Sequence, residues 1–271
     1  MCRLLGCVSK ERTSLRHELL DAARPLLRPG DDNDSGWGLA VYPHGDGEQP
    51  NCFRSPTNAS ADDGAAAHAD RSGRILMAHV RKATRGGLVE ENTHPFCLGE
   101  YAFCHNGTIG APDRLLGLPE GAGPAGETDS ERLFHRLLRE VNPDPATVVD
   151  GLRRAVHAAA TCAPLSALNF LFSDGEHLYA YRLGVFEMHW LAREGQILVA
   201  TERMTDEAWH DVLQDVLLVL SPGDDEPHAE RLLGDDALAA VRFDPFDEGS
   251  ELRGDERGRF AAEQAAATAR E

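Results

Sequence analysis

The chain lacks long apolar runs and basic clusters. None of its apolar runs approaches the roughly 20 residues that a helix needs to span a bilayer. Residues 1–16 lack the long apolar stretch of a signal peptide. Lysine and arginine number 27 against 45 aspartates and glutamates, which gives a formal net charge of −18. Because nucleic acids and anionic membrane surfaces attract basic patches, we exclude both as partners and predict a cytoplasmic protein.

Signatures of metal sites and disulfide scaffolds are also missing. The twelve histidines show no HExxH or similar metal spacing, so we predict no metal ligands. The six cysteines form no CxxC pair and are too scattered for a small disulfide-stapled fold. We expect most of them to be buried or unreactive thiols. They are Cys2, Cys7, Cys52, Cys97, Cys104 and Cys162.

The chain does contain enough apolar sequence for a core. Its 271 residues, 42% of them hydrophobic, allow one large domain or two small ones. Short apolar runs between turn residues predict strands, and the Asp174-Gly175 pair between two of them predicts a hairpin. The predicted strands cover 2–8, 36–42, 75–80, 101–104, 167–172, 177–181, 186–191, 196–200 and 216–220.

Helices are predicted in three places. Leu and Ala repeat at helical spacing over 15–27, capping residues begin a helix near Thr128 or Asp129, and a third helix covers about 146–160. Residues 43–73 are polar and rich in turn formers, which predicts a long loop.

The order of these elements favours an α+β fold. Strands come first, then two central helices, then more strands, which suggests two sheets with helices packed against them in one domain. We assign residues 2–222 to this domain. The acidic remainder, 223–271, is predicted to be a C-terminal extension that is partly flexible.

The second residue is the first candidate for chemistry. Removal of Met1 would expose Cys2 as an N-terminal residue, with a thiol nucleophile beside an α-amine. The unperturbed pKa of an α-amine is about 7.7–8.0, so at neutral pH the amine is partly uncharged and can take the thiol proton. An N-terminal residue acting with its own amine is one way to activate a weak nucleophile. Cys2 alone proves nothing, since any residue can follow Met1.

Five polar islands lie where predicted strands end or helices begin. At such places a rigid scaffold presents polar groups to a ligand. The islands are Asp34-Ser35-Gly36-Trp37-Gly38, Ala78 to Gly86, Asn92-Thr93-His94-Pro95-Phe96, His105-Asn106-Gly107 and Gly126 to Glu131.

The islands match the needs of one substrate class, an amino acid whose side-chain acyl group is cleaved. Its α-carboxylate needs an arginine, for which Arg81 is the candidate, and its α-ammonium needs a carboxylate, for which Asp129 is the candidate. Thiol attack creates an oxyanion, and the Asn106 side chain and the Gly107 backbone N–H are candidate donors to it. Taken singly, each also fits a surface arginine, a helix cap or a hairpin turn.

Taken together and in this order, the islands and Cys2 resemble the class II glutamine amidotransferases, members of the N-terminal nucleophile hydrolase superfamily. The resemblance extends to about residue 220 and is strongest for the short stand-alone members, which include ergothioneine-pathway γ-glutamyl hydrolases. The matching motifs are Cys2, Arg81 with Thr84, Asn92-x-His94-Pro95, His105-Asn106-Gly107, Thr128-Asp129-Ser130-Glu131, Ser173-Asp174-Gly175 and Ala200-Thr201-Glu202.

The resemblance implies a four-layer αββα sandwich and a role for each site residue. Cys2 would be the nucleophile, its freed amine the general base, and Asn106 with Gly107 the oxyanion hole. Glutamine or a γ-glutamyl amide would be the substrate, and no cofactor or metal is implied. The substrate-binding set would be Arg81 and Thr84 at the α-carboxylate, Asp129 at the α-ammonium, and His94.

The sequence leaves the leaving group open. Glutamine could be cut and its ammonia passed to a separate synthase partner, since the acidic remainder is too short for a synthase domain. A larger γ-glutamyl conjugate could be trimmed instead. The chain could also be an inactive relative that serves as a regulatory subunit, a reading that gains if Met1 is retained. One departure from the larger members concerns the entrance: they carry Arg-Gly where Asp31-Asp32-Asn33 stands here. No oligomeric state is predicted.

Overall fold

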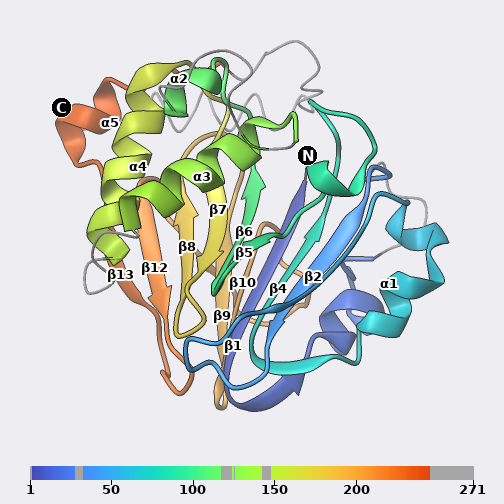
Figure 1. The fold of residues 1–271 in the computed structure, drawn as a ribbon. Coiled ribbons are helices and arrows are strands. Elements are labelled where there is room, and N and C mark those ends of the chain that lie inside the picture. The colour runs from blue at the N-terminus through green and yellow to red at the C-terminus, as the bar shows by residue number, and fades with distance from the viewer. Residues whose placement is uncertain (1, 28–32, 117–123, 125, 142–147, 245–271) are drawn as a thin grey trace.

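Two antiparallel β-sheets stacked face to face form the centre of the molecule (Figure 1). The computed structural model describes residues 2–27, 33–116, 124, 126–141 and 148–244. The first sheet has seven strands in the order β11-β9-β10-β1-β4-β2-β3. Their bounds are β1 (Arg3–Ser14), β2 (Trp37–Tyr42), β3 (Asn51–Ser55), β4 (Ser72–Val80), β9 (His189–Arg193), β10 (Gln196–Ala200) and β11 (His210–Asp211).

The second sheet has six strands in the order β13-β12-β8-β7-β6-β5. The hairpin predicted at Asp174-Gly175 connects β7 to β8, and Gly175 takes the left-handed conformation that the turn requires (φ +85°). The strand bounds are β5 (Phe96–Leu98), β6 (Tyr101–Asn106), β7 (Asn169–Ser173), β8 (Leu178–Arg182), β12 (Val216–Leu220) and β13 (His228–Arg231).

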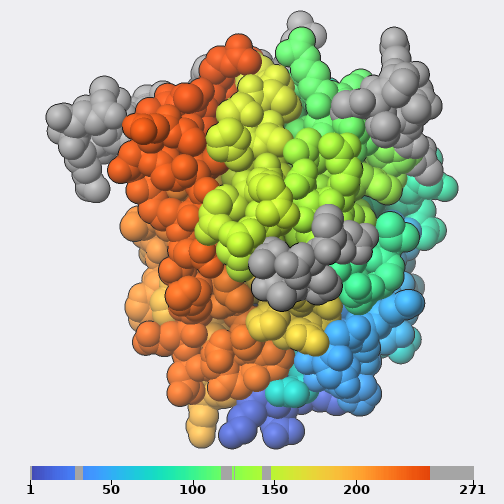
Figure 2. Space-filling view, turned by 60° about the vertical axis from the view of Figure 1, so that its left-hand side comes forward, coloured from blue at the N-terminus to red at the C-terminus, as the bar shows by residue number. Residues whose placement is uncertain are grey.

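Two helices cover the outer face of the second sheet: α3 (Asp129–Val141) and α4 (Val148–Cys162). The stripe of α3 that includes Leu133 and Leu137 packs with Phe103 of β6 in one apolar cluster. Figure 2 shows both helices beside the C-terminal part of the described chain. The remaining helical segments are short: α1 (Asp63–His68), α2 (Asp113–Leu116), α5 (Asp235–Ala239), a π-helical turn (His17–Asp21) and 3₁₀ turns at Ala59–Ala61 and Glu90–Asn92.

A thin helical layer covers the outer face of the first sheet. Leu19 from the π-helical turn and Ala65 from α1 pack against Trp37 and Leu39 of β2. A separate apolar cluster fills the space between the two sheets. The molecule is therefore a four-layer αββα sandwich, and the predicted α+β fold class is confirmed.

The alternation of side chains along the central strands determines what faces the space between the sheets. On β1, Leu4 and Val8 point into this space, and on β6 Cys104 does. Because residues two apart in an extended chain share a face, Cys2, which directly precedes β1, and Asn106 at the end of β6 belong to the same inner surface. These two strands pack against each other across the sheets.

The helix predicted over 15–27 is wrong in its length. Its apolar side chains are buried as expected, but only the turn His17–Asp21 is helical. Pro25 gives the physical reason: proline has no N–H for a helical hydrogen bond and disfavours helical conformation in the residue before it. Arg24 accordingly donates its backbone N–H to Met204 O at 3.0 Å, outside any helix.

The loop predicted over 43–73 contains regular structure. Strand β3 pairs with β2, and α1 begins where Asp62 accepts a hydrogen bond from Gly64 N at 2.8 Å. The Asp62 carboxylate also accepts from Trp37 Nε1 at 2.8 Å, which fixes α1 on the sheet. The sequence did not indicate either element because the segment is polar. Few side chains of the edge strand β3 and of the short helix α1 are buried, so no apolar pattern marks them.

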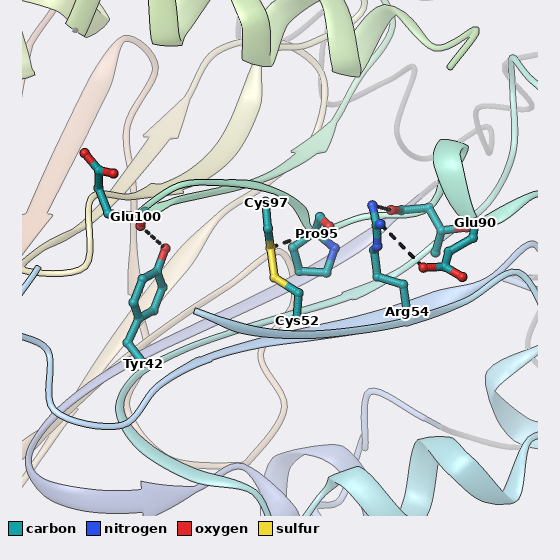
Figure 3. Close-up of a disulfide and its surroundings, with 8 residues drawn as sticks. Tyr42, Cys52, Arg54, Glu90, Pro95, Cys97 and Glu100 are labelled. Carbon is teal, nitrogen blue, oxygen red and sulfur yellow. Dashed lines mark hydrogen bonds and ion pairs between the residues drawn. A yellow bond between two sulfur atoms is a disulfide. The ribbon is translucent and has the colours of Figure 1, made fainter. Parts of the chain in front are cut away.

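The cysteines follow the expectation with one correction. Cys2, Cys7, Cys104 and Cys162 are free thiols, whereas Cys52 and Cys97 form a disulfide (Figure 3). They are 45 residues apart in sequence. Only the stacking of the sheets brings β3 and β5 together, so sequence spacing could not reveal the pair.

Residues 223–244, the described part of the predicted extension, pack against the rest of the fold. Strand β13 pairs with β12, and Leu232 and Val241 are buried in the cluster beneath α3 and α4. Asp215 ties this region down by accepting from Leu233 N at 2.8 Å and Tyr181 Oη at 2.9 Å. The boundary at 222 stays a prediction. Residues 245–271, part of the predicted flexible extension, lie outside the described residues.

The described ranges contain neither a membrane-spanning helix nor a cluster of metal-ligating side chains. No helix there is both long and apolar enough to cross a bilayer. No group of three or more His, Cys, Asp or Glu side chains in the same part of the chain is arranged to hold a metal ion.

Candidate active site

Cys2 lies directly before β1, the central strand of the first sheet, and is partly buried. Antiparallel pairing of Arg3 with Val80 brings the end of β4 alongside. The Cys2 Sγ atom is therefore 3.4 Å from Lys82 N and 3.5 Å from Lys82 O. Burial raises the pKa of the Cys2 thiol, while the Lys82 N–H and the charge of Arg81 act in the opposite direction.

Arg81 extends from the end of β4 and is buried, with 3% of its surface exposed. Its guanidinium donates only to backbone carbonyl oxygens: Ser35 O at 3.4 Å, Arg85 O at 2.7 Å, Gly86 O at 3.3 Å and Gly87 O at 3.2 Å. Within the described chain no carboxylate forms an ion pair with it. Burial lowers the pKa of Arg81, and the nearby Cys2 and Asp129 raise it. A buried cation without an anion is a site for a carboxylate.

Asp129 is the first residue of α3 and is also buried. Its Oδ2 accepts from Ile109 N at 2.7 Å, and the positive end of the helix dipole favours its negative charge. Its charge is among the causes that raise the pKa of Cys2 and of Arg81. No cation among the described residues forms an ion pair with Asp129, which leaves the carboxylate available to an ammonium group.

Asn106 ends β6 and is 1% exposed. Its Nδ2 amide is buried and has no hydrogen-bond partner in the described part of the chain. Buried donors are nearly always satisfied, so an exception calls for an explanation. Cys104, two residues earlier on the same face, packs with Leu4 of β1 in the apolar cluster between the sheets. The free donor of Asn106 therefore lies on the surface that faces Cys2.

The backbone at Gly107 passes so close to that of Ala167 that no side chain would fit at position 107. A Cβ atom there would be 2.0 Å from Ala167 O. Position 107 therefore requires glycine for space, independently of any hydrogen bond that its N–H makes. Asn106 and Gly107 do not form a hairpin turn, because β6 pairs with β7 through Asn106 and the chain then leads to α2.

His105 connects this strand end to α3. Its Nε2 lies 3.3 Å from Ala167 O and its Nδ1 lies 2.9 Å from Ser130 Oγ. A carbonyl oxygen only accepts, so Nε2 carries the proton and Nδ1 accepts from the Ser130 hydroxyl. Burial lowers the pKa of His105, which agrees with this neutral tautomer. The ring fixes the start of α3, and with it Asp129, relative to Asn106.

His94 and Thr84 lie less centrally. His94 is 3% exposed, its ring packs 4.3 Å from the ring of His79, and neither of its nitrogens has a partner among the described residues. Burial lowers the pKa of His94 well below its ordinary value, with His79 acting in the same direction. The neutral His94 ring is therefore part of the interior. Thr84 is exposed on the loop after β4.

The loop after β4 is held by Asn92. The Asn92 side chain donates to Gly87 O at 3.2 Å and accepts from Glu127 N at 2.9 Å, so it joins the loop around Arg81 to the segment before α3. Sequence reasoning gave no role to Asn92, Lys82 or His79. The position of His79 could have been predicted, because on β4 it shares the inner face with Met77.

Comparison with known proteins identifies the family of the chain. The model of the class II glutamine amidotransferases matches residues 1–195. The chain therefore belongs to this family, and its four-layer sandwich is the fold that the resemblance implied.

Three relatives show the range of the similarity. An uncharacterized protein of Methanocaldococcus jannaschii is 29% identical over 261 residues, covering 83% of this chain and 70% of that protein. The γ-glutamyl-hercynylcysteine sulfoxide hydrolase of Mycobacterium tuberculosis is 33% identical over 227 residues, covering 78% of this chain and 89% of that protein. Glutamine phosphoribosylpyrophosphate amidotransferase from B. subtilis superimposes with a TM-score of 0.64 at 17% identity, over 85% of this chain and 49% of that one. This last likeness concerns the fold alone.

Proposed function

We propose that the protein hydrolyses the γ-amide of glutamine or of a γ-glutamyl amide through a γ-glutamyl thioester on Cys2. The observations that carry the proposal are the burial of Arg81 and Asp129, the buried Asn106 amide without a partner among the described residues, and the position of the Cys2 thiol 3.4 Å from Lys82 N, next to Arg81. Arg81 and Asp129 provide one buried cation and one buried anion, neither of which forms an ion pair within the described part of the chain, and this suits the two charged groups of an α-amino acid.

Substrate binding follows from these charges. The Arg81 guanidinium receives the α-carboxylate, with Thr84 from the same loop, and Asp129 receives the α-ammonium. The ring of His94 is buried against His79. We therefore propose that His94 acts on substrate binding indirectly, by supporting the loop around Arg81. The substrate side chain then extends toward Cys2.

The chemistry needs no group beyond the chain and water. With Met1 removed, the α-amine of Cys2 takes the thiol proton and the sulfur attacks the γ-carbonyl carbon. The oxyanion is held by Asn106 Nδ2 and the Gly107 N–H. When the C–N bond breaks, the protonated amine gives its proton to the leaving nitrogen. Water then hydrolyses the thioester to glutamate and restores the thiol.

Two leaving groups have support. In the first version glutamine is cut and ammonia passes to a separate synthase partner. In the second a larger amine leaves, and the 33% identity to a γ-glutamyl-hercynylcysteine sulfoxide hydrolase favours it. A substrate panel separates the two: glutamine turnover that depends on an added synthase selects the first, and turnover of a bulky γ-glutamyl conjugate alone selects the second.

The mechanism is tested at Cys2 itself. Intact mass should show that Met1 is removed, and a diazoketone analogue of glutamine should label Cys2 alone among the six cysteines. Cys2→Ser should lose nearly all turnover while keeping the wild-type melting temperature. Labelling at another cysteine, or full activity with Met1 retained, contradicts the mechanism and favours a regulatory role.

A further inference from the structure

The Cys52–Cys97 disulfide joins the two sheets at one edge of the sandwich (Figure 3). Cys52 belongs to β3, the last strand of the first sheet, and Cys97 to β5, the last strand of the second. Their Cα atoms are 6.8 Å apart. β3 and β5 belong to different sheets and do not pair with each other, so the sulfur bridge is a covalent link between sheets at this edge.

The same edge holds the end of the loop that surrounds Arg81. Arg54, two residues after Cys52 on β3, donates to Thr93 O at 3.4 Å and forms an ion pair with Glu90 at 3.5 Å (Figure 3). Four residues beyond Thr93, Cys97 is bonded to the same strand. Strand β3 therefore anchors residues 90–97 at both ends, by Arg54 and by the disulfide.

These anchors are continuous with the substrate-binding loop. Asn92, inside the anchored segment, bonds to Gly87 O, and Gly87 O also accepts from Arg81. The segment packs so closely on β2 that a Cβ atom at Gly38 would lie 2.2 Å from His94 O. A displacement of residues 90–97 therefore shifts the carbonyl oxygens that orient the Arg81 guanidinium.

We propose that the Cys52–Cys97 disulfide is a site of thiol–disulfide exchange with a dithiol reductant, and that its cleavage weakens substrate binding by releasing the loop around Arg81. The proposal rests on the function proposed above. Cys2 directly precedes β1 and Asn106 ends β6, and both strands are paired on both sides within their sheets. Cleavage therefore leaves the chemical step nearly unchanged, and the effect falls on KM.

The proposed thiol–disulfide exchange is chemically balanced with the dithiol reductant as the only other reactant. A thiolate of the reductant attacks one sulfur of the bridge, its second thiolate resolves the mixed disulfide, and the products are two protein thiols and one oxidised reductant. Both cysteines are partly exposed, and the neighbouring Leu98 is 55% exposed, so the bridge is accessible from solvent. In the reduced state the Cys97 thiol has an acceptor nearby, since its Sγ lies 4.0 Å from Pro95 O.

The test compares one preparation of the full chain in two redox states. Thiols of the denatured protein are titrated with a chromogenic disulfide reagent, where four should react before treatment with dithiothreitol and all six after it. KM and kcat for the best substrate of the panel, and the rate of Cys2 labelling by the diazoketone analogue, are then measured in both states. Releasing one ordered loop should raise KM roughly three- to tenfold with kcat within about twofold.

The double variant Cys52→Ser/Cys97→Ser is the matched control. Its KM should equal that of the reduced wild type and should not respond to dithiothreitol. Equal KM values in the two wild-type states, with thiol counts showing complete reduction, overturn the proposal without reference to the variant. Six reactive thiols in air-oxidised protein overturn it as well. Absence of both turnover and Cys2 labelling in either state instead refutes the proposed function.

Discussion

Replacing Asn106 by leucine should make the protein both more stable and nearly inactive. The Asn106 Nδ2 group is buried without a partner among the described residues, and such a group costs about 1–3 kcal/mol of folding free energy. Leucine has a similar shape and no donor, so Asn106→Leu recovers part of this cost. At roughly 2–4 °C per kcal/mol for a chain of this size, the melting temperature should rise by a few degrees.

Activity should change in the opposite direction. If the unpaired donor is reserved for the oxyanion, its removal should lower kcat about 100- to 1,000-fold. Thermal melts followed by circular dichroism and steady-state turnover of the preferred substrate measure the two effects on one sample. A donor kept unpaired at the expense of stability is what a catalytic group predicts.

Asn169 provides a matched control because it pairs directly with Asn106 in the sheet. It is equally buried, but its amide donates to Phe186 O at 2.9 Å and its carbonyl accepts from Leu183 N at 3.0 Å. Asn169→Leu leaves both backbone groups unpaired and should destabilise the fold by about 1–3 kcal/mol. If Asn106→Leu destabilises as much as Asn169→Leu, or keeps wild-type turnover, the reasoning about the oxyanion hole is wrong.

Three further predictions concern charge. Asp129→Asn should raise KM roughly 10- to 100-fold, because it removes a charge-assisted bond to the substrate ammonium, and an unchanged KM would place the ammonium elsewhere. Burial lowers the pKa of His79 to about 3, so its ring stays neutral in the folded protein but takes up a proton in the unfolded chain below pH 6.5. The free energy of unfolding should therefore fall by about 1.4 kcal/mol per pH unit as the pH is lowered from 6.5 toward 3. In thermal melts of His79→Gln, the melting temperature should depend less steeply on pH. Burial raises the pKa of Glu131, whose Oε2 has no hydrogen-bond partner among the described residues, so Glu131→Gln should raise the melting temperature at pH 7 but not at pH 4; equal shifts at both pH values would contradict this.

The catalytic strands could be predicted because their signals are local. The apolar runs that became β1, β4 and β6 are short, bounded by polar residues and buried on both faces. The helix that begins at Asp129 carries its own cap, since Thr128 Oγ1 accepts from Glu131 N at 3.2 Å. Ordered motifs at the ends of these elements then indicated which side chains would meet.

What the sequence could not show depends on contacts between distant segments. The bond between Cys52 and Cys97 requires the two sheets to be stacked in one register, and the pairing that makes β3 a strand comes from β2. The burial of His94 against His79 also depends on this stacking. The motif indicates that His94 is important, but whether its ring faces the ligand or the core depends on how the interior is packed.

The hydrogen bonds of His105 have a consequence for how the two halves of the proposed substrate site are held. Through Ser130 and Ala167 they keep Asp129 and the oxyanion donors on one rigid unit. Arg81, by contrast, is oriented by carbonyl oxygens of its own loop. Under the proposed function, the position of the ammonium site is therefore set by the sheet and α3, whereas the carboxylate site depends on the conformation of the loop after β4.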